Sequence, residues 1–420
     1  MSGASRYAKS DRWLPQALRW TPQGAQTMSK APARFPQGAY PVVLDRGRGA
    51  WVWDVDDHRY LDWSAALGAV LLGHGHAEVT KAVRAQLRKG TSFSLPTRLE
   101  AEVAEALCQV FPCGGATGSV RFVKTGSEAN AAACRIARRI TGRELILCCG
   151  YLGWHDWTLV RQYVHPGVPD GLDQFVQSFQ YNDLASVEAA AAGRDVAAVL
   201  LEPVMFEPPA LGFLEGLRVW THQHGALLIF DENVCGGRWA PGGAQEYFSV
   251  TPDLCTFGKG WANGLPLAGV MGPRALMQAA ETVSGTFGGE ALSLAACRAV
   301  LACHRREDVC ARLWRTGTAL MEGINALDMA VHLAGYAVHP RLVFPHDPDQ
   351  EQMSLFLQET AARGLLLHPG GLNVMAAHGP RNVRLTVRRC REALDAMGRG
   401  AALRGQCIQP NAFVRPVAVP

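Results

Sequence analysis

The sequence has little net charge and no long apolar run. Its 420 residues carry a formal charge of +4 at pH 7, and 19% of them are charged, which argues against a dedicated nucleic-acid-binding protein. No segment has the length and apolarity of a membrane span, and the N-terminus has no recognisable signal sequence. We therefore expect a cytoplasmic protein without membrane contact. Because 48% of the residues are hydrophobic, the chain can bury a core of enzyme size.

The paired cysteine and histidine spacing of a metal site is also missing. The chain has 12 cysteines, but Cys148 and Cys149 are adjacent, and Cys108 and Cys113 have no matching histidine cluster. A zinc site needs such paired ligands. We expect no metal site, a reducing compartment, and cysteines that serve as small core residues.

Short apolar runs alternate with segments of helical periodicity up to about residue 300. Repeated strand–helix units form mainly parallel sheets that helices cover, so the sequence predicts an α/β fold. The predicted strands are Val120–Val123, Leu145–Cys148, Val196–Leu201, Leu227–Phe230, Leu254–Phe257 and Ala268–Met271.

The two ends of the chain differ from this central part. Proline, glycine and glutamine predict irregular structure in the first fifty residues, whereas the alternation in Trp51–Trp63 predicts a hairpin that turns at Asp56 and Asp57. Later the pattern predicts a smaller α+β domain, with strands at 331–333 and 341–344. We expect an N-terminal segment (residues 1–60) that packs with the small domain, a large domain (residues 61–300) and the small domain (residues 301–420).

Two of the predicted strands end in residues that complement each other. Asp231 directly follows one strand, and Lys259 comes shortly after the next. In an open α/β sheet the ligand lies off the carboxyl ends of the strands. A lysine amine and a carboxylate suit pyridoxal phosphate, since the amine forms a Schiff base and the acid holds the pyridinium proton. Taken alone, a lysine after a strand is more often a surface residue.

The other strand ends offer residues that the same cofactor needs. Gly126 and Ser127 open a helical pattern whose free N–H groups suit a phosphate, although such a pair is more often a simple cap. Tyr151, between glycines, is a candidate for stacking on the pyridine ring, or it covers the core. Glu202 either orients the ligand or caps the sheet, and Thr286 adds a hydroxyl in a glycine-rich loop. The convergence is more specific than any single motif.

With these motifs the chain resembles the class III (ω-type) pyridoxal-phosphate aminotransferases, and among them the branch of glutamate-1-semialdehyde 2,1-aminomutase. The resemblance runs from about Trp51 to about Ala393. Its most specific stretches are Gly90–Thr97, Phe230–Glu232 and Gly242–Leu254. It implies the aspartate-aminotransferase-like fold type I, in which a large domain holds a mainly parallel seven-stranded sheet beside a smaller α+β domain. It also implies a homodimer with shared active sites, in which Thr286 reaches the cofactor phosphate of the second subunit.

The resemblance implies roles for the remaining motif residues, with pyridoxal 5'-phosphate (PLP) or its aminated form (PMP) as the cofactor. Lys259 corresponds to the Schiff-base lysine, which later carries protons. Asp231 corresponds to the partner of the pyridinium nitrogen, and Tyr151 to the stacking aromatic. Gly126 and Ser127 correspond to the phosphate cradle.

Several positions depart from the family pattern. Asn233 stands where an aliphatic residue packs beneath the ring, and Glu207 where the aminomutases have an asparagine near O3′ of the cofactor. Lys30 falls where the aminomutase has a carboxylate-binding arginine, and Leu67 where it has a substrate-facing tryptophan. A lysine lacks the planar fork with which arginine matches a carboxylate, and a leucine leaves a wider pocket than a tryptophan. Both changes suit a larger acceptor, such as a sugar, a nucleoside-like group or a natural-product intermediate. In the alternative alignment, Lys30 is a surface residue.

The leading hypothesis is an aminotransferase that moves an amino group from a donor amino acid to a carbonyl substrate. The same cofactor also supports an aminomutase, an epimerase or a decarboxylase, because the outcome depends on which Cα bond stands perpendicular to the ring. A protein that keeps this fold only for binding or regulation is disfavoured, since Lys259 and Asp231 are both present.

Overall fold

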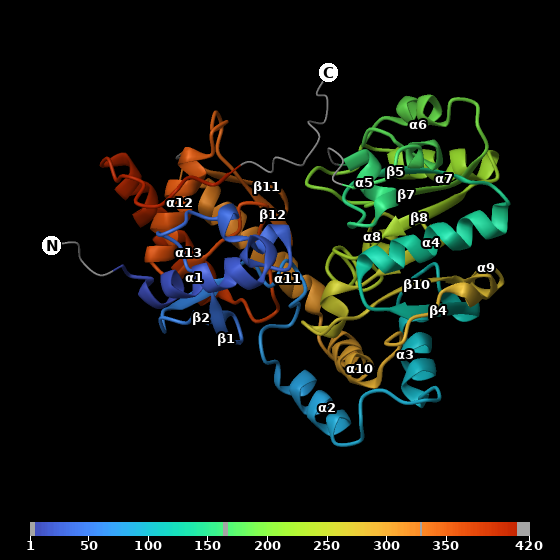
Figure 1. The fold of residues 1–420 in the computed structure, drawn as a ribbon, viewed down its shortest axis with the longest axis horizontal. Coiled ribbons are helices and arrows are strands. Elements are labelled where there is room, and N and C mark those ends of the chain that lie inside the picture. Colours follow the sequence, from blue (N-terminus) through green and yellow to red (C-terminus); the bar gives the residue numbers. More distant parts are fainter. Residues whose placement is uncertain (1–4, 163–166, 328–329, 410–420) are drawn as a thin grey trace. The chain divides into compact units, whose positions relative to one another are not determined.

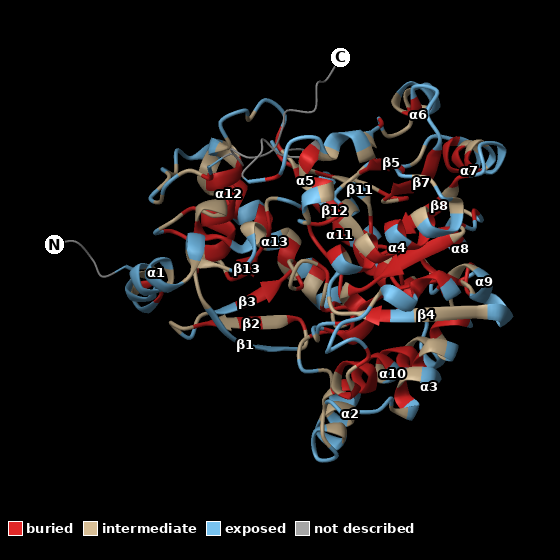
Figure 2. Ribbon diagram, turned by 45° about the vertical axis from the view of Figure 1, so that its right-hand side comes forward, coloured by how far each residue is buried: buried red, intermediate tan, exposed pale blue. Residues whose placement is uncertain are grey.

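The computed structural model describes residues 5–162, 167–327 and 330–409. It divides into two compact units. Of the described residues, the first unit joins 5–76 with those from 311 to 409, and the second unit is Ala77–Cys310. Each unit encloses buried residues of its own (Figure 2).

A seven-stranded sheet forms the centre of the second unit, with the order β4-β10-β9-β8-β7-β5-β6 (Figure 1). Strands β9 to β6 along this order are parallel, whereas β10 is antiparallel to both of its neighbours. The strands are β4 (Gly118–Val123), β5 (Leu145–Cys149), β6 (Val176–Ser178), β7 (Val196–Leu201), β8 (Leu227–Asp231), β9 (Leu254–Phe257) and β10 (Ala268–Pro273). The predicted mainly parallel sheet is confirmed. The short strand β6 was not predicted.

Helices cover this sheet because its central strands are apolar throughout. All of β7 is buried, as expected for a strand with packing on both faces. Helix α4 contributes Ala133, Ile136 and Ala137 to the core beside the sheet. The helices of this unit are α2 (Ala77–Leu87), α3 (Arg98–Cys108), α4 (Gly126–Thr141), α5 (Asp156–Gln162), α6 (Leu184–Ala191), α7 (Phe213–Gln223), α8 (Gly243–Tyr247), α9 (Arg274–Met277) and α10 (Ala291–Arg306).

The first unit is a smaller α+β assembly. Its main sheet has the order β1-β2-β3-β13, and a separate hairpin pairs β11 with β12. The predicted hairpin at Trp51–Trp63 is confirmed by the antiparallel pair β2–β3. The strands are β1 (Leu44–Arg48), β2 (Trp51–Asp54), β3 (Arg59–Asp62), β11 (His332–Tyr336), β12 (His339–Val343) and β13 (Leu365–Leu366), and the helices are α1 (Ala8–Trp20), α12 (Glu351–Ala362) and α13 (Pro380–Gly398). Helix α11 (Val309–Asn325) begins at the end of the second unit and continues in the first.

The prediction of irregular structure before residue 50 was wrong for helix α1. The helix contains Pro15, and an internal proline normally breaks a helix because it removes a donor and crowds the preceding turn. The helix begins under a long-range cap: Asp56 accepts hydrogen bonds from the N–H groups of Lys9 and Ser10 at 2.7 and 3.0 Å. Although burial opposes it, these donors hold the pKa of Asp56 below its ordinary value.

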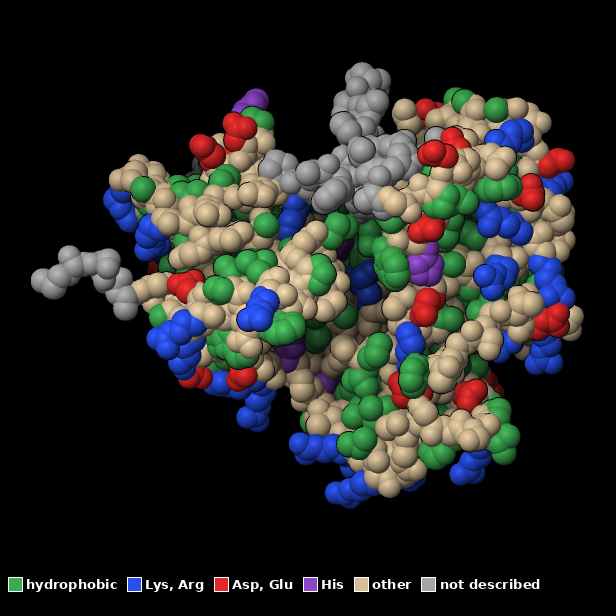
Figure 3. Space-filling view, in the orientation of Figure 1, with side chains coloured by type: hydrophobic (Ala, Val, Ile, Leu, Met, Phe, Trp, Pro, Cys, Tyr) green, Lys and Arg blue, Asp and Glu red, His purple; other side chains and the backbone are tan. Residues whose placement is uncertain are grey.

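Charges and cysteines are distributed as in an ordinary folded enzyme. On the face seen in Figure 3, acidic and basic side chains intermingle over the second unit. The cysteines are free thiols, and all except Cys407 are buried. Within the described ranges no cluster of side chains could hold a metal ion, and no helix there is long and apolar enough to cross a bilayer.

Candidate active site

Asp231 is a buried carboxylate at the carboxyl end of the large sheet, and three donors bind it. It ends β8 and is only 5% exposed. The Asn130 amide donates to its Oδ2 at 2.7 Å, and Asn233 donates to its Oδ1 from the backbone at 2.9 Å and from the side chain at 2.7 Å. A buried carboxylate is costly unless it accepts hydrogen bonds. Three donors therefore fix the orientation of this one.

Asn130 connects this carboxylate to the neighbouring strand and loop. Its Oδ1 accepts from Thr256 of β9 at 2.7 Å, and its amide also donates to the Leu152 carbonyl at 3.0 Å. Sequence reasoning gave Asn130 no role. The available signal was position: Asn130 lies one turn before Ala133 on the face of α4 that packs on the sheet, and a polar residue on an apolar helix face needs a partner.

Lys259 follows the strand next to Asp231. Strand β9 pairs with β8 in parallel, with Thr256 opposite Asp231. Lys259 opens the short 3-10 turn Lys259–Ala262 with a φ of 41°, a conformation that is uncommon for any residue except glycine. Such strain is concentrated at functional sites. Before it, Gly258 leaves room for Asn233, because a Cβ at Gly258 would collide with the Asn233 side chain.

Tyr151 lies in the glycine-flanked loop after β5. Its N–H donates to Glu202 Oε2 at 2.8 Å, while the residue remains 53% exposed. Gly150 has a φ of 95°, and a Cβ there would lie 2.7 Å from Glu202 Oε2, so only glycine allows this approach. The loop is held at its backbone, which leaves the ring accessible.

Helix α4 begins at Gly126, where the sequence predicted the start of a helix. Thr125 and Glu128 form a capping box, in which each side chain accepts from the other residue's backbone N–H. The first helical N–H groups, at Gly126 and Ser127, have no acceptor within the helix. The Ser127 hydroxyl accepts from the Trp154 N–H at 3.3 Å.

Glu202 directly follows β7, and the charge of Asp231 acts on it. Burial, and after it the Asp231 carboxylate, raise the pKa of Glu202 to about 7, while the Tyr151 N–H and Lys259 act in the opposite direction. The hydrogen bond from the Tyr151 N–H ties the segment after β7 to the loop of Tyr151.

Two predicted residues, Thr286 and Glu207, lie in exposed segments. Thr286 is in an exposed loop, where it lines a cavity of about 260 Å³ together with Lys124, Arg135 and His155. Glu207 lies in an exposed stretch after β7. Their expected contacts with a cofactor remain predictions.

Lys30 and Leu67 line one cavity of the first unit. Its volume is about 300 Å³, and its wall is mostly apolar, with Phe35 and Tyr40 among the contributors. Lys30 is also exposed, at the end of the short 3-10 turn Met28–Lys30. The alternative that Lys30 is a surface residue therefore stays open.

The turn that carries Leu67 has an unusual backbone. Ala65, Ala66 and Leu67 have φ values of 48°, 51° and 60°, and each left-handed residue other than glycine costs about 1–2 kcal/mol. Asp62 supports the turn, because its Oδ1 accepts from the N–H groups of Ser64 and Ala65 at 2.8 and 3.0 Å. Strain of this kind next to a cavity suggests a functional surface.

The fold and the carboxyl-end residues together define a PLP-dependent enzyme of fold type I. The match to the family model described as aminotransferase class III covers residues 35–380, so the chain belongs to that family. A glutamate-1-semialdehyde 2,1-aminomutase of Desulfitobacterium hafniense (strain Y51) is 33% identical over 402 residues, which is 86% of this chain and 92% of that protein.

Solved structures lead to the same class. The PLP internal aldimine form of the FumI protein of Sphingopyxis sp. MTA144 superposes with a TM-score of 0.86 at 28% identity, covering 93% of this chain and 96% of that one. A glutamate-1-semialdehyde-aminomutase from Pseudomonas aeruginosa PAO1 in complex with PMP has a TM-score of 0.81 at 25% identity, with 93% and 94% covered. The protein is thus an enzyme of the transaminase and aminomutase type, and its cofactor is PLP or PMP.

The residues present fit this cofactor. A pyridinium nitrogen needs a buried acid, and Asp231 is such an acid, with Oδ2 held by the Asn130 amide at 2.7 Å. A phosphate needs free N–H donors, which the first turn of α4 provides. A planar ring needs an accessible aromatic face, and Tyr151 offers one.

Proposed function

We propose that this enzyme is an aminotransferase, which moves an amino group from a donor amino acid to a carbonyl substrate. One observation carries the proposal: Lys259 and the buried, three-fold hydrogen-bonded Asp231 follow adjacent parallel strands of one sheet. Neither residue is needed in this state by a protein that only binds ligands. When bound, PLP supplies an electron sink for bonds at the Cα of the substrate.

Each residue of the site then has a defined task. Asp231 would accept the N–H of the pyridinium ring, and the Asn130 and Asn233 amides hold its carboxylate in a fixed orientation. The Gly126 and Ser127 N–H groups bind the phosphate at the positive end of α4. Lys259 would hold the cofactor by its amine, and the same amine would move the proton at the substrate Cα. Tyr151 covers one face of the ring.

We propose that Glu202 positions the loop that carries Tyr151. Its Oε2 accepts the Tyr151 N–H at 2.8 Å, so it sets the height of the stacking loop. With a pKa of about 7, its charge changes within the working pH range, and the field at the ring changes with it.

The acceptor is proposed to be larger than a simple semialdehyde. In the cavity of the first unit, Leu67 and its aromatic neighbours suit an apolar moiety, and the Lys30 amine suits a remote anionic or hydroxylated group. Glu207 is proposed as a further substrate contact. Leu67→Trp should fill the cavity and raise KM for a bulky carbonyl acceptor about tenfold, with little change for pyruvate. An equal change in KM for both acceptors would show that the acceptor does not bind in this cavity.

An aminomutase is the second candidate, because the relative from Desulfitobacterium hafniense carries that name. The lysine at position 30 and the leucine at position 67 speak against the same substrate. Turnover of glutamate-1-semialdehyde by the purified enzyme would favour this candidate.

The direct test is the first half-reaction. Single amino acids are mixed with the PLP-loaded enzyme, and absorbance and mass spectra are recorded. A transaminase converts its donor into the corresponding keto acid, one per site, while the cofactor becomes PMP. Enzyme that releases carbon dioxide or an inverted amino acid instead would contradict the proposal.

We also propose a homodimer with shared sites. The support is the family, together with the exposed position of Thr286. Light scattering at micromolar concentration is the measurement, and an active monomer would contradict this arrangement.

A further inference from the structure

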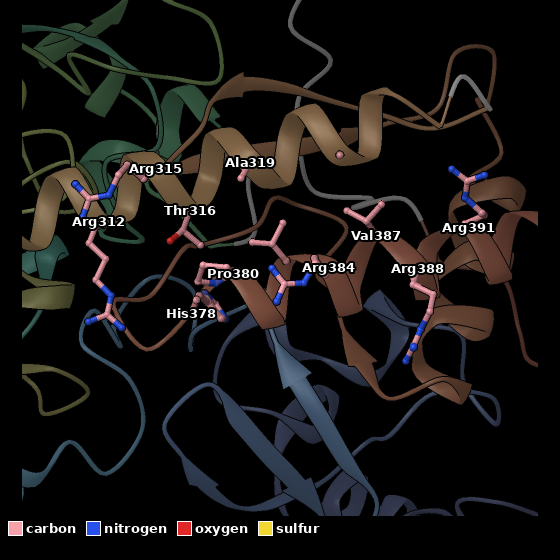
Figure 4. A pocket seen from close by; sticks show the side chains of 13 residues that line it. Arg312, Arg315, Thr316, Ala319, His378, Pro380, Arg384, Val387, Arg388 and Arg391 are labelled. Carbon is pink, nitrogen blue, oxygen red and sulfur yellow. The ribbon is translucent and has the colours of Figure 1, made fainter.

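A groove rimmed by arginines runs between helices α11 and α13 in the first unit. Its volume is about 970 Å³. The two helices run side by side along it, with arginine side chains at both ends and near the middle (Figure 4). The lining residues are Arg312, Arg315, Thr316, Ala319 and Gly323 of α11, and His378, Gly379, Pro380, Val383, Arg384, Val387, Arg388 and Arg391 in and before α13.

The arginines of this groove are exposed and largely unpaired. Arg388 lies 3.7 Å from Glu392, an ion pair between two exposed side chains, which contributes little. Within the described part of the chain, no carboxylate forms an ion pair with Arg312, Arg315, Arg384 or Arg391. Four guanidinium groups therefore point their donors toward solvent, where they can bind carboxylates in the bidentate manner.

The floor between the arginines is apolar. It consists of Ala319 from one helix and of Val383 and Val387 from the other. Gly323 allows the close approach at one end, because a Cβ there would lie 2.6 Å from Val387 Cγ2. An apolar floor with a cationic rim differs from a solvated basic helix face, which has no such floor.

We propose that this groove binds an acidic amphipathic helix of a partner protein. From Arg312 to Gly323 the lining spans 11 residue steps, or about 16 Å of α-helix, which matches about three turns of a bound helix. A narrow apolar stripe on such a helix would cover Ala319 and Val387. Acidic residues beside the stripe would reach the arginines of α11 and those of α13. This interaction lies outside the proposed amino transfer.

Two other occupants fit less well. Nucleic acid binding relies on backbone-tracking cations and aromatic stacking platforms, whereas the groove has an apolar floor with no tyrosine, tryptophan or phenylalanine among its lining residues. A second copy of the same groove would bring two arginine-rich rims together, which is repulsive. An acidic partner helix satisfies both the charge and the floor.

A binding assay with a defined probe tests the proposal. The probe is a fluorescein-labelled, helix-stabilised peptide of about 14 residues with a leucine stripe between two rows of glutamates. The comparison ligands are a scrambled peptide of equal composition, a single-stranded oligonucleotide of similar charge, and vesicles of phosphatidylglycerol. The full-length, PLP-loaded enzyme is used, as wild type and as Arg384→Glu. The matched control is Arg399→Glu, which makes the same charge change at an exposed residue just after α13 and outside the groove.

The proposal predicts that the amphipathic peptide binds at least about tenfold more tightly than its scrambled form, with affinity falling as salt rises. Arg384→Glu should weaken the peptide about tenfold or more, while Arg399→Glu changes it less than about twofold. Both variants should retain the donor half-reaction, which shows that they are folded. Equal binding of both peptides, equal effects of both variants, or tighter binding of the oligonucleotide or vesicles would overturn the proposal.

Discussion

The side-chain amide of Asn233 donates to Asp231 Oδ1 at 2.7 Å, beside the backbone N–H of the same residue at 2.9 Å. Asn233 therefore holds the acid through two donors. Gly126 and Gly258 make this possible, since a Cβ at either position would collide with the Asn233 side chain. Asn233 therefore packs against the start of α4 and the residue before Lys259 while it holds Asp231.

The first prediction concerns this amide. Asn233→Val removes the amide and with it one charge-assisted hydrogen bond, which contributes about 1.5–3 kcal/mol to a buried carboxylate. We expect kcat to fall about tenfold or more, because the carboxylate gains freedom to turn away from the ring, while KM for the donor changes little. Steady-state kinetics at saturating PLP measures this.

Thr256→Ser is the matched control, since it keeps the hydroxyl that donates to Asn130 at 2.7 Å. It should leave kcat within about twofold of the wild type. Asn233→Val with unchanged kcat would show that the orientation of Asp231 does not depend on this amide.

The second prediction concerns the stability of the cofactor-free protein and its dependence on pH. The pKa of Glu202 rises from 4.5 to about 7 on folding, so the folded protein binds the proton more tightly than the unfolded chain. The contribution of Glu202 is therefore fully present below about pH 4.5 and is lost as the pH rises through about 7, by at most about 3 kcal/mol.

Glu202→Gln keeps an acceptor for the Tyr151 N–H and removes the titration. The free energy of unfolding of this variant, relative to the wild type, should therefore increase between pH 5 and pH 8. Denaturant unfolding at both pH values measures the difference. The same difference at both would mean that Glu202 titrates normally.

The third prediction separates backbone strain from close packing at the stacking loop. Gly153 has a φ of 112°, and a Cβ there would collide with Ser127, whereas Gly193 has a φ of 69° with open space around it. Gly193→Ala should cost about 1 kcal/mol through strain alone. Gly153→Ala should cost more, because its φ is less accessible to alanine and its Cβ displaces Ser127. Only the displacement of Ser127 should also weaken PLP binding. Equal losses of stability and of PLP affinity in both variants would show that the loop does not need the close contact between Gly153 and Ser127.

The fourth prediction tests the reach of Thr286 between subunits. Lys259→Ala should be inactive, and Thr286→Ala should bind PLP about tenfold more weakly. In a mixed dimer, one site combines Lys259 of one subunit with Thr286 of the other, so co-refolding the two variants should restore up to one intact site per mixed dimer. Activity at limiting PLP is measured. If the activity of the co-refolded mixture does not exceed that of the Thr286→Ala enzyme, Thr286 acts at the site of its own subunit.

Local patterns in the sequence were enough for the large sheet and the strand-end residues. Buried parallel strands are continuous apolar runs, so β7 and β9 were predicted with their observed bounds, and Asp231 and Lys259 stood out as the polar residues that follow such runs. Strand β6, with the sequence Val-Gln-Ser, has no apolar run to reveal it.

Features that depend on distant residues could not be predicted in this way. Helix α1 is capped by Asp56, which lies 46 residues or more along the chain, and its internal proline masks the helical pattern. Asn130 acquires its partners only when α4 packs against β8 and β9. The shared cavity of Lys30 and Leu67 likewise depends on a left-handed turn without glycine at three positions.

The most direct test of the central claim is transfer of a labelled amino group. The enzyme is supplied with a ¹⁵N-labelled donor amino acid, identified in the half-reaction, together with a panel of unlabelled carbonyl acceptors, and the products are analysed by mass spectrometry. An aminotransferase predicts ¹⁵N in the new amine and one keto acid released for each amine formed, with both lost in Lys259→Ala. Movement of nitrogen within a single molecule, with no ¹⁵N in a second product, would contradict the account.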